Sequence, residues 1–278
     1  MRIGYHVSLS EYNSFKEVVQ EVKNYKANVI QIFLTNPRTG KIKEREDEYY
    51  KKIKSLLKKN NIECFVHSSY TINLAKDWDK YSWWITTLIK EFHYANLIGA
   101  KGIVIHFGKK LELSEGQAFN NMFSSIAYIL NQTKDTKVDF LLETSAGQGT
   151  ELCSTLEQFS RFFRKIKLLN NKRVGICIDT CHIYAAGYNI KLDSGFELYL
   201  DSFEELIGLK YVKLLHLNDS KKGCGSKLDR HENIGKGYIG FTPLKRVYKY
   251  FNKLKIPVIL ETPSGKYKEE IKRLTKSI

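Results

Sequence analysis

Apolar residues gather in short continuous runs, separated by longer stretches in which they are spaced differently. Eight runs are rich in Ile, Val and Leu and too continuous to be half exposed, which is typical of parallel strands covered on both faces. They are RIGYHV (2–7), NVIQIFL (28–34), IECFVH (62–67), GIVIHF (102–107), VDFLLE (138–143), VGICID (174–179), VKLLHLND (212–219) and PVILE (257–261). The pattern predicts eight buried parallel strands.

The stretches between these runs repeat their apolar residues at three and four positions, with Lys and Glu on the opposite face. Clear examples of this helical spacing are 14–25, 46–60, 83–100 and 155–169. Strand alternating with helix indicates parallel βα units, and eight units in 278 residues favour a closed (β/α)8 TIM barrel over an open doubly wound sheet. A dinucleotide-binding sheet would carry GxGxxG after the first strand, and GYHVSLSEYNS has none. We predict a single domain over residues 1–278.

The charge balance narrows the choice of partner. The chain has 45 Lys and Arg against 30 Asp and Glu, a formal net charge of +15. Such a field attracts polyanions, nucleic acid above all, although a lysine-rich solubilising surface would give the same excess. Five cysteines without a CxxC pair indicate neither a disulfide framework nor a Cys-rich zinc site. With no signal peptide and no membrane-length apolar run, we expect a soluble intracellular protein.

Six of the eight predicted strands end in a polar side chain. A lone His or Asp at a strand end is commonly a cap or a hydrogen-bonded core group. In a barrel of parallel strands, however, all six would meet on the C-terminal rim, where crowding is costly unless a metal neutralises it. Imidazole and carboxylate donors suit Zn²⁺, with Mn²⁺ or Fe²⁺ as alternatives. The six are His67, His106, Glu143, Asp179, His216 and Glu261.

Two loops add candidate ligands. His182 follows Asp179 by three residues, and Asp229 and His231 alternate within the loop 217–237, so that extended backbone would project both to one side. We expect His6 to support the ligands by hydrogen bonding, His93 to lie in packing or on the surface, and Cys177 and Cys181 to pack as small apolar groups. Nine ligands imply two or three metals, the usual equipment for attack on a phosphodiester. With the basic charge, this favours phosphoryl transfer on nucleic acid.

Six motifs, in order and spread over the chain, closely resemble the endonuclease IV family of apurinic/apyrimidinic (AP) endonucleases. They are GYHVS, HSSYTINLA, ETSAGQGTEL, RVGICIDTCHIYAAGY, LLHLNDSKKGCGSKLDRHENIGKGYIG and VILETP. The resemblance implies a xylose-isomerase-like barrel with three Zn²⁺ that hydrolyses duplex DNA 5′ of an abasic site in base excision repair. The products would be a 3′-hydroxyl and a 5′-deoxyribose phosphate, and trimming of 3′-blocking groups stays open.

The resemblance also implies roles for the nine residues, with Glu261 and Glu143 as the catalytic pair. Glu143 would bridge two zincs, a hydroxide between these zincs would attack phosphorus, and Glu261 would orient or deprotonate it. The third zinc would stabilise the leaving 3′-oxygen, and Mn²⁺ or Fe²⁺ could replace zinc at one site. The zinc sets are His67, His106 and Glu143; Glu143, Asp179, His216 and Glu261; and His182, Asp229 and His231.

The family pattern extends to DNA contacts. Arg38 and Tyr70 match positions that enter the helix where the damaged nucleotide leaves the stack, although Tyr70 alone would suggest an aromatic covering the rim. Departures at Pro37, Gly40 and Thr71 predict a weaker or differently shaped wedge. Lysines in rim loops could contact phosphates or could simply be solvated. The DNA-contact candidates are Arg38, Tyr70, Thr71, Lys221, Lys222 and Lys227, together with Lys109 and Lys110.

Two other readings share the barrel. Sugar isomerases and epimerases hold one or two divalent metals, but they need an enclosed pocket and no positive field, and they lack the pair Asp229 and His231. An inert DNA-binding relative would have lost ligands, and none is lost. We therefore expect a monomeric enzyme with duplex DNA as partner, without an organic cofactor or a membrane. It would act in a bacterial cytoplasm or, for a eukaryotic or viral source, in a nucleus, virus factory or virion.

Overall fold

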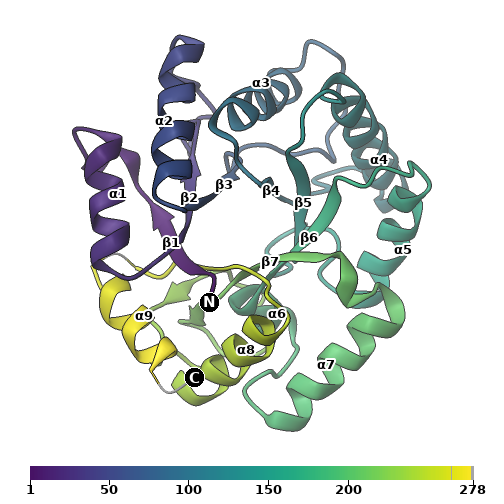
Figure 1. Ribbon diagram of the computed structural model, residues 1–278. Helices are drawn as coiled ribbons and strands as arrows, with labels where there is room; N and C mark the ends of the chain where they lie inside the picture. Colours follow the sequence, from purple (N-terminus) through teal and green to yellow (C-terminus); the bar gives the residue numbers. More distant parts are fainter. Residues whose placement is uncertain (264, 277–278) are drawn as a thin grey trace.

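Eight parallel strands form a closed barrel inside a ring of helices (Figure 1). The computed structural model describes residues 1–263 and 265–276. Around the barrel, β1 is followed by β2 to β7 in order and then by β10, which pairs with β1. The strands are β1 (Ile3–Val7), β2 (Val29–Phe33), β3 (Glu63–His67), β4 (Gly102–His106), β5 (Asp139–Glu143), β6 (Val174–Asp179), β7 (Val212–His216) and β10 (Val258–Leu260). The predicted fold class is confirmed.

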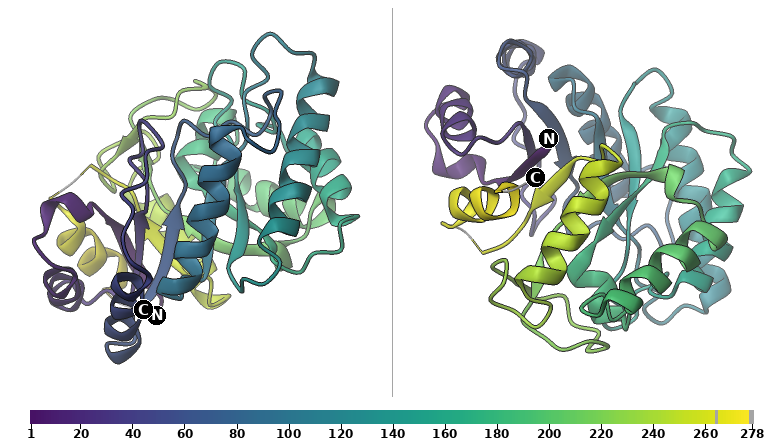
Figure 2. Two further views of the ribbon diagram at one scale, coloured as in Figure 1. Left: turned by 90° about the horizontal axis from the view of Figure 1, so that it is seen from above. Right: turned by 60° about the horizontal axis from the view of Figure 1, so that its bottom comes forward.

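Helices connect the strands and surround the barrel (Figure 2), and their buried apolar residues belong to the core outside it. The helical stretches expected from the sequence form α1, α2, α3 and α5, within two residues of the predicted ends. Two helices, α6 and α7, lie between β6 and β7. The helices are α1 (Phe15–Asn24), α2 (Asp47–Lys59), α3 (Trp83–Ile98), α4 (Glu115–Gln132), α5 (Leu156–Lys167), α6 (Thr180–Ala186), α7 (Asp193–Leu206), α8 (Phe241–Lys253) and α9 (Tyr267–Thr275), with 3-10 turns at Leu9–Glu11 and Leu209–Tyr211.

The run 212–219 does not form one continuous strand. β7 ends at His216, and Asp219 and Ser220 form β8, which pairs antiparallel with β9 (His231–Glu232) outside the barrel. The Asp219 carboxylate accepts hydrogen bonds from the backbone N–H groups of Ser220, Gly235, Gly237, Ile239 and Gly240. A carboxylate with this many donors stabilises a loop rather than a strand, so the polar end of the run leaves the barrel and anchors the segment 233–240.

The barrel interior has an apolar layer with a polar layer above it. Seven strands contribute one residue each to the apolar layer, and side chains in a strand alternate between its two faces. The residue two positions later therefore points inward as well, one layer nearer the C-terminal rim. The apolar layer is Val29, Phe65, Val104, Leu141, Cys177, Leu214 and Ile259, and the corresponding polar layer is Gln31, His67, His106, Glu143, Asp179, His216 and Glu261.

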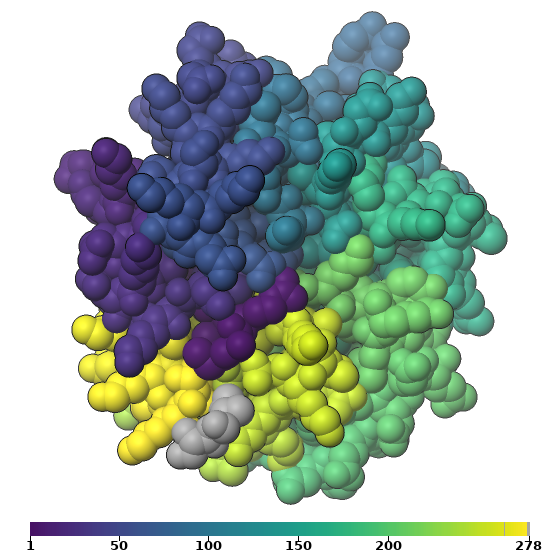
Figure 3. Space-filling view, in the orientation of Figure 1, coloured from purple at the N-terminus to yellow at the C-terminus, as the bar shows by residue number. Residues whose placement is uncertain are grey.

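Strand β1 contributes Gly4 and His6 to these two layers, because Ile3, Tyr5 and Val7 belong to the core outside the barrel. A Cβ added at Gly4 would lie 1.5 Å from the carbonyl oxygen of Val29. Any side chain here would therefore separate β1 from β2. The first strand also meets the last part of the chain, and the N-terminal and C-terminal segments, purple and yellow in Figure 3, lie against each other.

Glu91 is a fully buried carboxyl group on α3, outside the polar layer. Thr35 Oγ1 donates to its Oε1 at 2.8 Å, and burial raises the pKa of Glu91 to about 8 from its ordinary value of 4.5. Between these two values the folded state binds a proton that the unfolded state lacks, so stability falls as pH rises. Between pH 5 and 8 we expect this group to cost the wild type about 3 kcal/mol of stability. Glu91→Gln should not show this loss, and urea unfolding at the two pH values measures it.

The control for this prediction is Glu48→Gln on α2, because the Glu48 side chain is 66% exposed. That variant is expected to keep the wild-type pH dependence. Equal slopes of stability against pH for wild type and Glu91→Gln would contradict the assignment.

No helix within residues 1–263 and 265–276 has the length and hydropathy needed to cross a membrane.

Candidate metal and DNA-binding site

Strand register brings the first candidate ligands together. His106 on β4 is the pairing partner of Glu143 on β5, and Asp179 on β6 is the partner of His216 on β7. Glu261 follows β10 directly and does not lie within it, because that strand ends at Leu260. All nine predicted ligands lie in three groups whose donor atoms are within 4.8 Å of one another inside each group.

The first group joins β3, β4 and β5. Glu143 Oε2 lies 2.9 Å from His106 Nε2 and 3.4 Å from His67 Nε2. His67 and Glu143 are almost fully buried, whereas the His106 side chain is 29% exposed. The group therefore sits at the bottom of an opening and can be reached from the His106 side.

The second group shares Glu143 with the first. The other oxygen of Glu143, Oε1, lies 2.7 Å from His216 Nδ1. His216 Nδ1 is also 3.0 Å from Glu261 Oε2 and 3.9 Å from Asp179 Oδ2. Because the two oxygens of Glu143 face different groups, this carboxylate has the geometry of a bridge between them. Asn218 donates to Asp179 Oδ2 at 2.6 Å, and its Oδ1 accepts from the Glu261 backbone N–H at 2.8 Å.

Asp179 also connects the second group to the third. Its Oδ1 accepts a hydrogen bond from the backbone N–H of His182 at 2.9 Å and caps the N-terminus of α6. An N-cap carboxylate typically bonds the N–H two or three residues later. The cap therefore places His182 in the first turn of α6, immediately beyond the strand end, and explains the spacing of three residues.

The third group contains His182, Asp229 and His231. Asp229 lies between the two imidazoles, with Oδ2 3.2 Å from His182 Nε2 and Oδ1 3.1 Å from His231 Nε2. His231 begins β9, and its Nε2 is 3.7 Å from Asp179 Oδ2 of the second group. The long loop after β7 thus folds back over the barrel and delivers two ligands that no barrel strand carries.

Backbone carbonyls set the orientation of three imidazoles. The Nδ1 atoms of His67, His182 and His231 lie 2.7, 2.8 and 3.1 Å from the carbonyl oxygens of Ser68, Thr144 and Glu261. A carbonyl can only accept, so each Nδ1 carries the proton and each Nε2 lone pair faces its group, the arrangement typical of metal-binding histidines. Within the described residues, three buried atoms there lack a hydrogen bond: Glu143 Oε2, His182 Nε2 and His231 Nε2.

These unpaired atoms fit metal ions better than a closed hydrogen-bond network. Burial acts to raise the pKa of Glu143, but His106 and His216 hold it well below its ordinary value. Burial acts to lower the pKa of His231, but the Asp229 carboxylate beside it raises the pKa to about 9. Without metal, protons therefore balance the carboxylates. A divalent cation would displace those protons, and imidazole with carboxylate is a donor set that zinc accepts.

The two cysteines near the groups are buried, in line with the packing role predicted from the sequence, and their sulfur atoms lie within 4.8 Å of candidate ligand atoms. Cys177 belongs to the inner apolar layer beneath Asp179, and Cys181 is buried on α6. Burial raises the pKa of each thiol to about 12, so both keep their protons at neutral pH. His93 lies apart on α3 with a side chain that is 57% exposed, 3.5 Å from Asp47. His6 does lie beside the ligands, and its Nδ1 is 3.7 Å from Glu261 Oε1.

An open cavity of about 300 Å³ leads to the three groups. His67, His106, His182, Asp229, His231 and Glu261 line it together with Tyr70, Lys221 and Arg230. Arg230 was not predicted as a site residue from the sequence, although it lies between the predicted ligands Asp229 and His231. Its Nη1 lies 3.2 Å from Gln148 Oε1, which also accepts from the Asp229 backbone N–H at 3.1 Å. Two cations therefore face a cavity that has metal-ligand side chains at its base.

The loops after β2 and β3 contact each other beside this cavity. Tyr70, 56% exposed, donates its backbone N–H to the Pro37 carbonyl at 3.1 Å, and its ring lies 5.4 Å from that of His67. Arg38 is exposed in the same loop pair. Gly40 has φ of +69°, and a Cβ there would lie 2.5 Å from the Trp83 ring. Trp83 thus occupies the space beside Gly40, where the sequence departs from the family pattern.

The remaining lysines lie around the rim without a common geometry. Lys222 and Lys227 are exposed in the loop before Asp229, and only Lys221 lines the cavity. Lys109 is 3.5 Å from Glu151, and Lys110 is partly buried beside it. Thr71 is exposed and its Oγ1 lies 2.7 Å from Ser69 Oγ. The structure therefore places Lys221 in the cavity with six candidate ligands, and all of these DNA contacts stay predictions.

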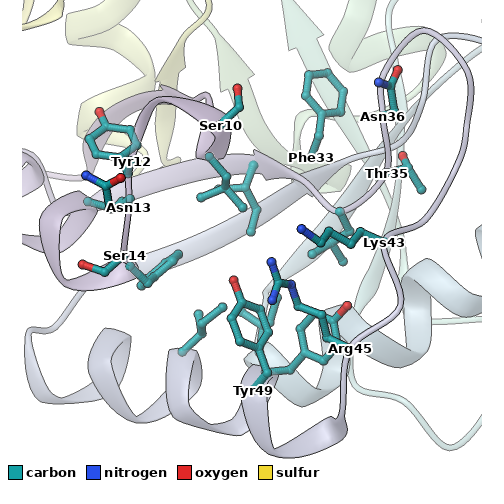
Figure 4. Close-up of a pocket in the computed structure, with 18 residues that line it drawn as sticks. Ser10, Tyr12, Asn13, Ser14, Phe33, Thr35, Asn36, Lys43, Arg45 and Tyr49 are labelled. Atoms are coloured by element: carbon teal, nitrogen blue, oxygen red, sulfur yellow. The ribbon is translucent and has the colours of Figure 1, made fainter.

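A larger cavity of about 460 Å³ lies outside the barrel, between the segment 9–15 and the loop and helix that follow β2 (Figure 4). Lys43 and Arg45 lie at its side near Tyr49. Among the described residues that line it there is no His, Asp or Glu. It therefore lacks the imidazole and carboxylate groups that a zinc site needs, and the three groups remain the candidate site.

Comparisons with known proteins agree with this geometry. The family model for xylose isomerase-like TIM barrels matches residues 19–277. The chain is 36% identical over 280 residues to "Probable endonuclease 4" of Mycoplasma mobile, covering 98% of this chain and 96% of the relative. It is 35% identical over 276 residues to "Probable endonuclease 4" of Halothermothrix orenii, covering 97% and 96%. The solved endonuclease IV from Thermus thermophilus matches with a TM-score of 0.84 and 26% identity, over 100% and 98% of the two chains.

The barrel and the matching family model define the class, a xylose isomerase-like TIM barrel. A D-tagatose 3-epimerase-like protein shares that fold with a TM-score of 0.75 at 19% identity, a likeness that shows the fold alone. Identity of 35% and 36% over nearly the whole length is more specific, and the chain belongs to the endonuclease IV family of AP endonucleases. The resemblance read from the six motifs is confirmed.

Proposed function

We propose that this chain is a zinc-dependent AP endonuclease of base excision repair, which hydrolyses duplex DNA 5′ of an abasic site and leaves a 3′-hydroxyl and a 5′-deoxyribose phosphate. Its class, a DNA-cleaving hydrolase, follows from the family. One observation carries the finer proposal: nine buried or half-buried ligands form three adjoining groups, two of which share Glu143, below a cavity lined by Lys221 and Arg230. The number and arrangement of these groups match in-line phosphodiester hydrolysis.

The proposed cofactor is three Zn²⁺, with Mn²⁺ or Fe²⁺ possible at one position. When bound, these ions would supply the charge that activates a water molecule and stabilises the oxygens of the reacting phosphate. The residues that would hold them are His67, His106 and Glu143; Glu143, Asp179, His216 and Glu261; and His182, Asp229 and His231. Removal of 3′-blocking groups would use the same residues, because it hydrolyses the same kind of bond.

The residues themselves perform the other tasks. Glu261 accepts a proton or orients water, since its carboxylate lies at the edge of the second group and lines the cavity. Lys221 and Arg230 would bind the phosphates beside the lesion. Tyr70 and Arg38 would fill the space in the helix that the damaged nucleotide leaves. All nine ligands come from one chain, so we propose a monomer with one barrel domain over residues 1–278.

The partner in this proposal is duplex DNA with an abasic site, without an organic cofactor or a membrane. A repair role would place the chain with a genome, in a bacterial cytoplasm, a nucleus, a virus factory or a virion. The sugar isomerase reading is less well supported, because an aldose or ketose site has no use for the third group or for the cations Lys221 and Arg230 that face the cavity.

Metal content and incision, measured on one sample, test the proposed function. Purified protein is expected to contain close to three zinc per chain and to cut a duplex carrying a tetrahydrofuran abasic analogue on its 5′ side. A polymerase should extend the product directly, because the new end is a 3′-hydroxyl. Chelation should abolish the cut and added zinc should restore it. One zinc or none, with no incision after zinc is added, would contradict the proposal.

Tyr70 is expected to contribute to lesion recognition, since its exposed ring lies beside the first group and at the junction with the Arg38 loop. Stacking of a base on an aromatic ring is worth about 1–3 kcal/mol. Tyr70→Ala should therefore reduce affinity for abasic duplex about tenfold and affinity for undamaged duplex much less, measured by fluorescence anisotropy. The control is Tyr81→Ala, since that ring is 76% exposed and pairs with Lys80. Equal losses on both duplexes would exclude the role.

A further inference from the structure

One buried amide lies among three polar side chains of the barrel interior. Gln31 on β2 has no exposed surface. Its Nε2 donates to Glu261 Oε1 at 2.6 Å and lies 3.0 Å from His6 Nδ1. Its Oε1 lies 2.8 Å from His216 Nε2. An amide offers two N–H groups and one oxygen, so each of these groups has a partner here.

Only one orientation of the amide suits these neighbours. The ionised carboxylate of Glu261 can only accept, so the NH₂ group of Gln31 must face it. The oxygen then faces His216 Nε2, and that nitrogen must carry a proton. The opposite orientation would set the amide oxygen against the Glu261 carboxylate, two acceptors without a proton between them.

This contact reverses His216 relative to the other imidazoles. His67, His182 and His231 each carry a proton on Nδ1, held by a backbone carbonyl, and present Nε2. His216 instead keeps its proton on Nε2 and presents Nδ1, the atom that lies 2.7 Å from Glu143 and 3.0 Å from Glu261. The group that imposes this tautomer is a side chain, and it can therefore be changed without altering the backbone.

We propose that Gln31 is a positioning residue for the second group. It selects the His216 tautomer that presents Nδ1, and it holds Oε1 of Glu261 so that Oε2 faces the group. The inference rests on the proposed function, because it concerns how the same zinc site is assembled. Loss of a hydrogen bond that orients a metal ligand typically weakens metal binding or activity about 10- to 100-fold.

The test compares Gln31→Leu with Thr35→Val. Both changes remove a buried hydrogen bond from the β2 region, but Thr35 bonds Glu91 and not a candidate ligand. In chelator competition at fixed pH, the most weakly held zinc of Gln31→Leu should dissociate about 10- to 100-fold more readily than in wild type. Thr35→Val should retain zinc as wild type does. Equal zinc affinity in the two variants would overturn the role of Gln31.

A spectroscopic readout separates tautomer selection from a loss of packing. In ¹⁵N-histidine spectra of the zinc form, wild type and Thr35→Val should show His216 with a protected Nε2–H and a bound Nδ1. In Gln31→Leu the Nε2–H should exchange with solvent or the ring should bind through Nε2. An unchanged His216 signal in Gln31→Leu would overturn the proposal even if zinc affinity fell.

If Gln31→Leu does not fold, Gln31→Glu replaces it. In Gln31→Glu, the new carboxylate still accepts from His216 Nε2, so zinc should be kept. It also lies against the Glu261 carboxylate, so incision should fall about tenfold or more. Unchanged incision would overturn the assignment. Chelator competition needs no DNA, so the two proposals fail separately. A wild type without zinc contradicts the proposed function, whereas a wild type with three zinc and an unaffected Gln31→Leu contradicts only this inference.

Discussion

Replacing Glu261 by Gln is expected to lower the rate of abasic-site incision about 10³-fold while zinc and DNA binding persist. Removal of a general base typically costs about 10²- to 10⁴-fold. His216 and the other positive groups around Glu261 outweigh the effect of burial and hold the pKa of this carboxyl well below its ordinary value. The carboxylate is therefore ionised across the neutral range and can orient water or accept a proton. The amide of Gln keeps an oxygen that can contact metal but cannot accept the proton.

Single-turnover incision, abasic-duplex affinity and zinc content must be measured on the same Glu261→Gln preparation. The matched control is Glu232→Gln on β9, because Glu232 follows a candidate ligand in sequence but belongs to none of the three groups. That variant should incise at nearly the wild-type rate. A wild-type rate for Glu261→Gln would refute the catalytic role. If zinc were lost in parallel with the rate, Glu261 would act only as a metal ligand.

Asp229→Asn is expected to remove one zinc of three and to lower incision about 10²- to 10³-fold. Asp229 lies between His182 and His231 and is the only carboxylate of its group. Without its charge, the site would have to hold a divalent cation with two imidazoles and a neutral amide. If this zinc stabilises the leaving oxygen, its loss should cost about as much as one electrostatic contact in a hydrolase active site, roughly 3–4 kcal/mol.

Zinc per chain after dialysis and the incision rate measure this effect. The control is Asp201→Asn, an exposed carboxylate on α7, which should leave both values unchanged. The first two groups do not contain Asp229, so two zinc should remain bound and the fold should be intact. Three zinc in Asp229→Asn, or an unaltered rate after one zinc is lost, would contradict the role of the third group.

Most of the candidate site could be predicted from the sequence, because a parallel barrel brings the ends of its strands close together. Each of His67, His106, Glu143, Asp179 and His216 ends a barrel strand, and parallel strands place such ends on one rim. The strand alternation that buries Leu141 towards the barrel axis also turns Glu143 inward. No knowledge of loops is needed for this inference, which is why these residues could be placed from pattern alone.

The loop after β7 was less predictable. The sequence indicated Asp229 and His231 through their alternation, but not why the loop folds back. That depends on Asp219, whose carboxylate accepts from four backbone N–H groups that lie 16 to 21 residues further along the chain. The DNA-contact candidates show the same limit: Lys221 lines the cavity and Lys222, its neighbour in sequence, does not.

By itself, the sequence determined the barrel and the family and indicated the nine candidate ligands, because each depends on residue type at regular spacing or on long matching motifs. Only the tertiary structure decided that Arg230 faces the cavity and that Gln31 reaches both His216 and Glu261. Gln31 lies 185 residues from His216 along the chain. It carries no charge and lies within an apolar run, so nothing local distinguishes it. Its role arises from closure of the barrel, which brings β2 across the interior from β7 and β10.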